Sequence, residues 1–516
     1  MSRPLVPLRA MLFGFGFGFG SRSRSGSGAL LGLALCTAPM ACGDDTGPPA
    51  SDASSTGETG QTSADGSSDT NTDTDTDTES EDSGGSDLPA EFVRPQLHSP
   101  AEAEDLDPAP DIVHVALSAA PHSFWVGDQL VDGWAYNGQV PGPTIRLQTG
   151  DTLIVDFQNE LGADTTVHWH GLHVPFAMDG VTWQGAPVGP GESFQYSFTV
   201  EQSGTYWYHP HVDSERQVDL GLYGVIVVED PQEPVADREL VVVFDSWDEY
   251  SFDNSGEAGH GGLDGATLEW TTNGLLDPVF PATAGERIRV RAVNVANAGY
   301  VDLRWPQMRQ IGSDQGLLPA LREPESVALA PSDRMEGEWL IGGGFEVVAQ
   351  PYSILGAPAV GTDLRLFEVQ VEEPGAAPSG LDFPFDGAEP TPDPGWTDIV
   401  YAFHGDPQTG RWTINGEQFP DITIETLTQD QWSVIELRNI SQAAHPYHLH
   451  GHGFEVLSVD GVAPPFRVFE DSYDVPPYAT VRLGLDPDNP GDWMSHCHIL
   501  PHLHGGMMTV LRVEAP

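Results

Sequence analysis

The chain has 516 residues, with 77 aspartates and glutamates against 21 basic residues, all of them arginine, so its formal net charge is −56. Such an acidic chain is a poor ligand for nucleic acids and other polyanions, whereas it attracts cations. The length is too great for one ordinary domain and predicts roughly three.

Residues 1–41 are typical of an export signal. Arg22 and Arg24 precede the apolar run 29–35, which is too short to span a bilayer. Cys42, which follows Ala41, resembles the lipid-modified cysteine of a bacterial lipoprotein, and removal of the leader without lipidation is the alternative. We therefore expect an exported protein, either periplasmic or a lipoprotein of the outer membrane or cell surface, which contacts a membrane only through this anchor.

Residues 42–107 are rich in Ser, Thr, Asp and Gly and contain a Thr-Asp repeat. This composition cannot bury enough apolar surface to fold, and its like charges extend the chain. We predict a disordered acidic linker that holds the folded part away from a surface.

The rest of the chain consists of short alternating runs separated by Gly, Pro, Asn and Asp, a pattern that predicts an all-β protein built of sandwiches. Three segments align without gaps, each a strand pattern that ends in Asn: 150–159, 285–294 and 430–439. We predict three similar β-domains at 108–232, 233–375 and 376–516, the last beginning with a Pro/Gly/Asp-rich linker.

Four His-x-His pairs occur in the first and third predicted domains, and none in the second. The pairs 168/170 and 209/211 of the first domain correspond to the pairs 448/450 and 496/498 of the third. One such pair is a weak signal, but four that match two by two predict that eight imidazoles converge on several copper ions.

Cys497 is the only cysteine of the predicted folded part. It is followed by His502 and Met507, and a thiolate, imidazoles and a thioether are the ligands of a blue-copper site, which needs one further histidine from elsewhere. Because successive side chains of a strand point to opposite faces, Cys497 can face one metal while His496 and His498 face others.

These motifs resemble the multicopper oxidase family in its three-domain form, shared by laccases and by bacterial copper-efflux and spore-coat oxidases. The resemblance implies cupredoxin-like Greek-key sandwiches and four copper ions, namely type 1, type 2 and a type 3 pair. It implies type 1 ligands His445, Cys497, His502 and axial Met507; type 2 ligands His168 and His448; and type 3 ligands His170, His209 and His498 for one ion and His211, His450 and His496 for the other.

The resemblance also implies that electrons from a reductant enter near His445 or His502, pass through Cys497 to its neighbouring histidines, and reduce O₂ to water. This reaction consumes protons, and Asp179 matches the acid that family members carry after the first pair; a simple turn residue is the alternative. Where copper-efflux members have two acids after the type 1 histidine, this chain has Leu503 and His504. The second proton donor therefore stays open.

We expect a laccase-like enzyme, monomeric, that oxidises phenols or other small reductants with O₂. An oxidase of Cu(I), Fe(II) or Mn(II) is the rival, which the acidic surface favours and the absence of a Met-rich insertion disfavours. A copper-sequestering protein without turnover is a third possibility, and a copper nitrite reductase is disfavoured by the three-domain repeat. The sequence leaves the substrate open.

Overall fold

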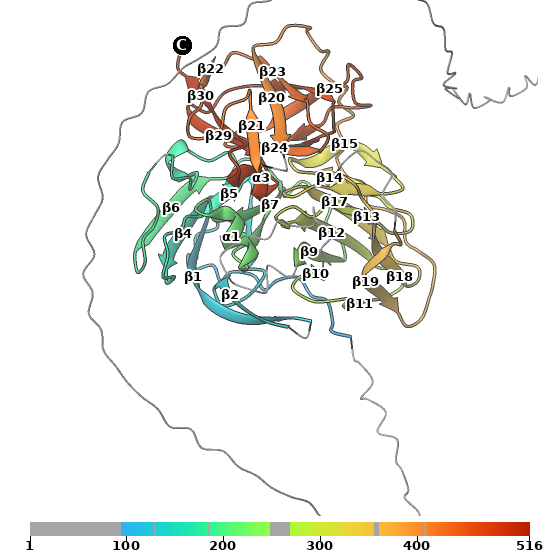
Figure 1. The fold of residues 1–516 in the computed structure, drawn as a ribbon. Helices are drawn as coiled ribbons and strands as arrows, with labels where there is room; N and C mark the ends of the chain where they lie inside the picture. Colours follow the sequence, from blue (N-terminus) through green and yellow to red (C-terminus); the bar gives the residue numbers. More distant parts are fainter. Residues whose placement is uncertain (1–93, 128, 184, 248–268, 355–360, 407–408) are drawn as a thin grey trace, which may run out of the picture. The chain divides into compact units, whose positions relative to one another are not determined.

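The computed structural model describes residues 94–127, 129–183, 185–247, 269–354, 361–406 and 409–516. The predicted signal, Cys42 and most of the predicted linker lie outside these residues. The described part is almost entirely β-structure, arranged as three groups of strands that follow one another along the chain (Figure 1).

Each group contains two sheets whose apolar side chains pack into one core. In the first sandwich, sheet β2-β1-β4-β6 faces sheet β3-β8-β7-β5. Its strands are β1 (Ile112–Val126), β2 (Gln129–Tyr136), β3 (Ile145–Gln148), β4 (Thr152–Asn159), β5 (His168–His170), β6 (Ser193–Thr199), β7 (Gly204–His209) and β8 (Gly224–Glu229).

The second sandwich pairs sheet β10-β9-β12-β17-β14-β15 with sheet β11-β19-β18-β13-β16. Its strands are β9 (Arg238–Trp247), β10 (Glu269–Thr272), β11 (Val279–Ala282), β12 (Arg287–Asn294), β13 (Val301–Arg304), β14 (Gln310–Ser313), β15 (Gly316–Arg322), β16 (Val327–Leu329), β17 (Arg334–Leu340), β18 (Phe345–Gln350) and β19 (Leu364–Val371).

The third sandwich pairs sheet β21-β20-β23-β28-β25-β26 with sheet β22-β30-β29-β24-β27. Its strands are β20 (Ile399–Asp406), β21 (Arg411–Ile414), β22 (Glu425–Thr428), β23 (Ser433–Asn439), β24 (His445–Leu449), β25 (Phe454–Val459), β26 (Phe469–Glu470), β27 (Ser472–Val475), β28 (Thr480–Leu485), β29 (Gly491–Cys497) and β30 (Met508–Glu514). The predicted all-β, cupredoxin-like fold class is confirmed, while the domain boundaries themselves stay predictions.

The described residues contain few helices, all short: η1 (Phe176–Met178), α1 (Ser214–Asp219) and α3 (Leu500–His504). α1 and α3 contact each other, although one follows the first sandwich's β7 and the other follows β29 of the third. Within the described ranges, no helix is long and apolar enough to cross a bilayer.

The three repeated segments occupy the same place in each sandwich. β4, β12 and β23 each pair in parallel with the first strand of their group and antiparallel with a second neighbour, β6, β17 or β28. Their alternate apolar residues are buried, as the period-2 pattern predicts.

The asparagine that ends each repeat is buried and organises the loop that follows it. The side-chain Oδ1 of Asn159, Asn294 and Asn439 accepts the backbone amide two residues later, at 2.9, 3.2 and 2.9 Å. The Nδ2 donates to a backbone carbonyl further along the same loop, at 2.8, 2.8 and 2.7 Å. A buried amide satisfied in this way fixes the loop against the end of its strand.

Residues 94–107 differ from the prediction, which placed them in the disordered linker. Leu97 is fully buried in the core of the second sandwich and its amide donates to the Val279 carbonyl at 2.8 Å. Ala103 donates likewise to Thr144 in the first sandwich at 2.9 Å. The few apolar residues of this acidic stretch give no clear periodic signal, so composition alone missed this ordered segment.

Candidate metal centre

The four histidine pairs lie on equivalent strands of the first and third sandwiches. β5 carries the first pair and β24 leads into the third, and the residues between the paired histidines, Trp169 and Leu449, belong to the cores of their sandwiches. Because alternate strand residues share a face, both histidines of each pair point away from the core.

The second and fourth pairs begin at the ends of β7 and β29, beside the first and third. His209 is the partner of His168 across the β5/β7 pairing, and His496 is the partner of His448 across the β24/β29 pairing. Each sandwich therefore presents four imidazoles from two adjacent strands.

The two sets of imidazoles meet across the contact between the first and third sandwiches. The rings of His168 and His450 stack with centroids 3.9 Å apart, and those of His170 and His448 stack at 3.7 Å. All eight histidines are buried. The structure thus brings together every residue of the four predicted pairs.

Within the cluster, the three imidazoles of one predicted type 3 set, His211, His450 and His496, bring their Nε2 atoms close together. The Nε2 of His496 lies 3.0 Å from the Nε2 of His450 and 3.4 Å from the Nε2 of His211. The Nδ1 of His450 faces the Oδ2 of Asp179 at 2.9 Å, and the Nδ1 of His496 donates to the Cys497 carbonyl at 3.1 Å. With their protons on these outer nitrogens, the imidazoles turn lone pairs toward a common point.

Other histidines of the cluster are arranged in the same way. The Nδ1 atoms of His168, His209 and His448 donate to backbone carbonyls at 2.8 to 2.9 Å. Their Nε2 atoms are buried and have no hydrogen-bond partner among the described residues. Metal-bound imidazoles show this pattern, with one nitrogen held by a neighbouring oxygen and the other free for the ion.

The other predicted ligand sets of the cluster, those of the type 2 ion and the second type 3 ion, are less clearly separated. Ligand atoms of His168, His170 and His209 lie within 4.8 Å of one another, as do those of His168, His448 and His450. His498 joins no such group, but its ring is 5.0 Å from that of His170 and 5.5 Å from that of His209. The division of these residues between a type 2 and a type 3 ion stays a prediction.

Burial favours the neutral form of His448, His450 and His496. Removal from water lowers the pKa of His496 to about 4 and, helped by the neighbouring imidazoles, lowers the pKa of His448 and His450 well below the usual range. Neutral imidazole is the form that binds a metal ion.

Asp179 is placed by the short η1 turn and the glycine that follows it. A Cβ at Gly180 would lie 1.9 Å from the Val167 carbonyl oxygen, so only glycine lets the backbone approach the strand that carries the first pair. The fully buried carboxylate of Asp179 then reaches His450 and lies 3.3 Å from the Nδ1 of His168.

A second carboxylate, Asp471, lies on the other side of the cluster and was not found from the sequence. Its Oδ1 lies 3.1 Å from the Nε2 of His170, and its backbone carbonyl accepts from His448. Arg334 of the second sandwich binds this carboxylate through both terminal nitrogens. No local motif marks either residue, because they meet only through the packing of two sandwiches.

The predicted type 1 residues form a separate cluster. The Sγ of Cys497 lies 3.5 Å from the Nδ1 of His502 and 3.7 Å from the Nδ1 of His445, and the two nitrogens are 3.2 Å apart. Two ligand atoms bonded to one ion at about 2.0 to 2.3 Å in a trigonal arrangement lie about 3.5 to 3.8 Å apart. The three atoms therefore fit one copper ion.

Met507 and Ser441 complete the surroundings of this cluster. Met507 is fully buried in the same core as Cys497, whose amide donates to the Met507 carbonyl at 3.1 Å. With its Nδ1 turned to the sulfur, His445 donates from Nε2 to the Ser441 hydroxyl at 2.8 Å, and Ser441 donates to Asn439. The asparagine that ends the third repeat thereby orients a predicted copper ligand.

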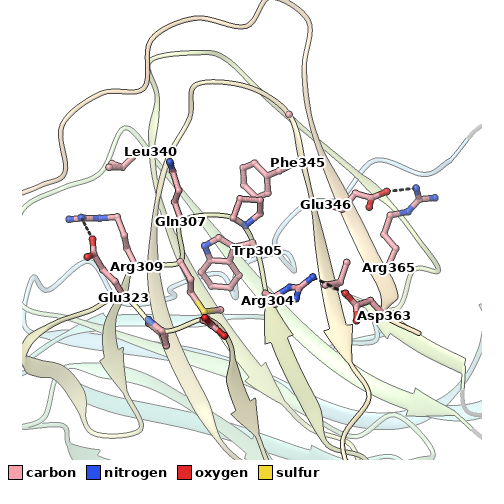
Figure 2. A pocket seen from close by; sticks show the side chains of 16 residues that line it. Arg304, Trp305, Gln307, Arg309, Glu323, Leu340, Phe345, Glu346, Asp363 and Arg365 are labelled. Atoms are coloured by element: carbon pink, nitrogen blue, oxygen red, sulfur yellow. Dashed lines mark hydrogen bonds and ion pairs between the residues drawn. The ribbon is translucent and has the colours of Figure 1, made fainter. Parts of the chain in front are cut away.

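A surface cavity of about 1160 Å³ lies on the second sandwich (Figure 2). It is lined by apolar residues, including Trp305 and Phe345, and by three arginines whose ion pairs with carboxylates are drawn there. None of the described residues that line it is a predicted metal ligand, and its positive charges are already neutralised.

Comparison with known proteins agrees with this geometry. Sequence profiles described as multicopper oxidase match residues 122–233 and 392–516. The multicopper oxidase MmcO of Mycobacterium tuberculosis is 30% identical over 452 residues, which cover 77% of this chain and 86% of the relative. Copper resistance protein A of Escherichia coli is 25% identical, covering 73% and 89%. The crystal structure of a laccase from Pediococcus acidilactici is 25% identical, with a TM-score of 0.70 and coverage of 82% and 95%.

Copper binding at the Cys497 cluster is expected to release one proton. Burial raises the pKa of the Cys497 thiol well above its usual value and lowers that of His445 to about 3, so between pH 5 and 8 only the thiol is protonated in the copper-free protein. The apparent affinity should therefore rise about tenfold per pH unit over this range.

The measurement is a titration with copper against a competing chelator, followed by the intense Cu(II)-thiolate band near ~600 nm. Cys497→Ser, which has no thiolate, should lack the band at every pH. An affinity that does not change with pH, or a retained band in Cys497→Ser, would contradict the assignment.

Proposed function

The chain belongs to the multicopper oxidase family, and from this premise we propose that its reducing substrate is a small phenol or a similar organic reductant. The protein is an oxygen oxidoreductase that binds copper and couples one-electron oxidation of a reductant to four-electron reduction of O₂ to water. The observation that carries this proposal is that the side chains in contact with the type 1 histidines, Ser441 and Trp412, are uncharged.

We assign the ligands as the histidine clusters suggest. The type 1 site takes His445, Cys497, His502 and Met507; the type 2 site takes His168 and His448; and the type 3 pair takes His170, His209 and His498 for one ion and His211, His450 and His496 for the other. When bound, copper accepts single electrons at the type 1 site and binds and reduces O₂ at the other three ions.

The chain itself connects the two sites. Cys497 and His496 are adjacent on β29, and the His496 ring donates to the Cys497 carbonyl, so both a covalent path and a hydrogen bond link the thiolate to the buried cluster. The buried imidazoles also exclude bulk water from the place where O₂ is reduced.

We propose that Asp179 holds a proton for O₂ reduction. Its carboxylate is buried and touches His450, so a proton on it stays beside the cluster. Asp471 is less suited to this role, because its carboxyl oxygens are already bound by both terminal nitrogens of Arg334.

Asp179→Asn should keep the copper content and the ~600 nm band but slow reoxidation of the fully reduced protein by O₂ about 100-fold, because the amide cannot supply a proton. Stopped-flow recovery of the band after O₂ addition measures this rate. The exposed Asp164→Asn is the matched control and should reoxidise at the wild-type rate. Wild-type reoxidation in Asp179→Asn would make the residue structural.

The groups that contact the type 1 histidines favour an organic reductant. His445 donates to the neutral hydroxyl of Ser441, and the indole of Trp412 stacks on His502 with ring centroids 3.5 Å apart. Cu(I) is selected by thioether and thiolate ligands and iron by imidazoles among others, and neither the Ser441 hydroxyl nor the Trp412 indole is such a ligand. The rival function, oxidation of a metal cation, is favoured by the net charge of −56 and by the similarity to copper resistance protein A.

A side-by-side steady-state assay separates these functions. The copper-loaded protein should oxidise 2,6-dimethoxyphenol and an organic dye with a higher kcat/KM than Cu(I) or Fe(II), consuming one O₂ per four electrons. A higher kcat/KM for a cation would overturn the phenol proposal in favour of the rival. Copper binding without O₂ uptake would instead support sequestration.

We further propose that the protein is exported, monomeric and lipid-anchored at Cys42, from the apolar run and the residues around this cysteine. After expression of the full sequence in a bacterium, the mature protein should partition into detergent and carry the mass of acyl chains, whereas Cys42→Ala should stay in the aqueous phase. If wild type and variant partition alike, the anchor is absent.

A further inference from the structure

Neither nitrogen ligand of the type 1 cluster is accessible to a reductant. His445 and His502 are both fully buried. The outer nitrogen of His445 is occupied by Ser441, and the Nε2 of His502 has no hydrogen-bond partner among the described residues. Some other group must therefore carry the electron from the surface to the imidazoles.

Trp412 covers both histidines. Its ring is stacked on that of His502, with an interplanar angle of 27°, and meets the His445 ring edge-on at 5.8 Å. Trp412 as a whole residue is 7% exposed, whereas His445 and His502 are fully buried, so it is the least buried of the three.

Two glycines leave the space that this indole occupies. A Cβ at Gly405 would lie 1.9 Å from the Trp412 ring, and a Cβ at Gly505 would lie 2.4 Å from it, so the indole fits only because both positions are glycine. Gly505 is held in place by Gln418, which donates to its carbonyl at 2.7 Å. Two glycines from different parts of the third sandwich thus fix the indole on His502.

The position of Trp412 in the sheet makes it the outer member of this stack. β21 is an edge strand of the six-stranded sheet, and Gly410 and Arg411, directly before Trp412, are exposed.

We propose that Trp412 is the electron-entry residue of this enzyme. A donor docks over Trp412, and its electron crosses the indole–imidazole stack to the type 1 site. The donor loses one electron and the type 1 site gains one; a phenol also releases its proton to water, and no bond in the chain forms or breaks. The inference rests on the proposed oxidase function but not on which reductant is used.

The test compares the anaerobic reduction of the type 1 site by hydroquinone in copper-loaded wild type, Trp412→Leu, Trp412→Phe and Trp412→Tyr, followed at ~600 nm by stopped flow. Trp412→Leu should lower the second-order rate constant of reduction about tenfold, because an aliphatic side chain replaces the stacked π-system. Trp412→Tyr should recover most of the rate, and Trp412→Phe should lie between. Reoxidation by O₂ should be unchanged in all four.

Trp396→Leu is the matched control, because Trp396 is half-exposed in the same sandwich and contacts Trp432 rather than a histidine. It should reduce at the wild-type rate. The type 1 potential and the electron paramagnetic resonance spectrum are recorded for each variant, so that a change in driving force is separated from a change in electron path.

Wild-type reduction rates in Trp412→Leu at an unchanged potential would overturn the proposal, as would a rate change fully accounted for by the potential. If Trp412→Leu loses the blue band, its reduction cannot be followed. Equal rates of type 1 reduction in wild type, Trp412→Phe and Trp412→Tyr would then overturn the proposal. Failure of the wild type to oxidise hydroquinone would reject the phenol proposal alone, and the same variants would then be compared with Fe(II).

Discussion

The contact between the first and third sandwiches brings the Nε2 lone pairs of several histidines face to face in a buried space. The Nε2 of His496 lies 3.0 Å from that of His450 and 3.4 Å from that of His211, and burial lowers the pKa of each imidazole, so all three are neutral at neutral pH. A cation between the facing lone pairs relieves their repulsion, so copper binding stabilises the docking of the two sandwiches.

Neutral imidazoles bring no negative charge to either site, and other side chains lie beside them. At the buried cluster, the carboxyl groups of Asp179 and Asp471 each lie near two histidines. Arg334 binds Asp471 from the second sandwich. At the other site, the Cys497 thiol loses its proton when copper binds. A buried charge must be paired to persist, and bound copper is the partner that this thiolate requires.

The sequence predicted the parts of the site that repeat. The matched histidine pairs and the three strand patterns ending in asparagine indicate a duplicated β-domain, because both signals have a fixed spacing along one strand. Asp471 and Trp412 were missed, because their roles arise from contacts between strands far apart in the chain. The ordered segment 94–107 was missed for a related reason: only a few residues anchor it, Leu97 in the second core and Ala103 beside the first, within a composition typical of disorder.

The second sandwich contributes none of the predicted ligands, yet its side chains position both sites. Arg334 fixes Asp471 beside the histidine cluster. Near the other site, the carbonyl of Asn297 accepts the Leu500 amide at 2.9 Å, at the start of the helix that carries His502. Its own side chain donates to the Glu215 carbonyl in α1 of the first sandwich at 2.7 Å. The middle domain therefore acts as the frame that holds the first and third sandwiches at the separation that their facing histidines need, which explains why it keeps the repeated fold without the histidine pairs.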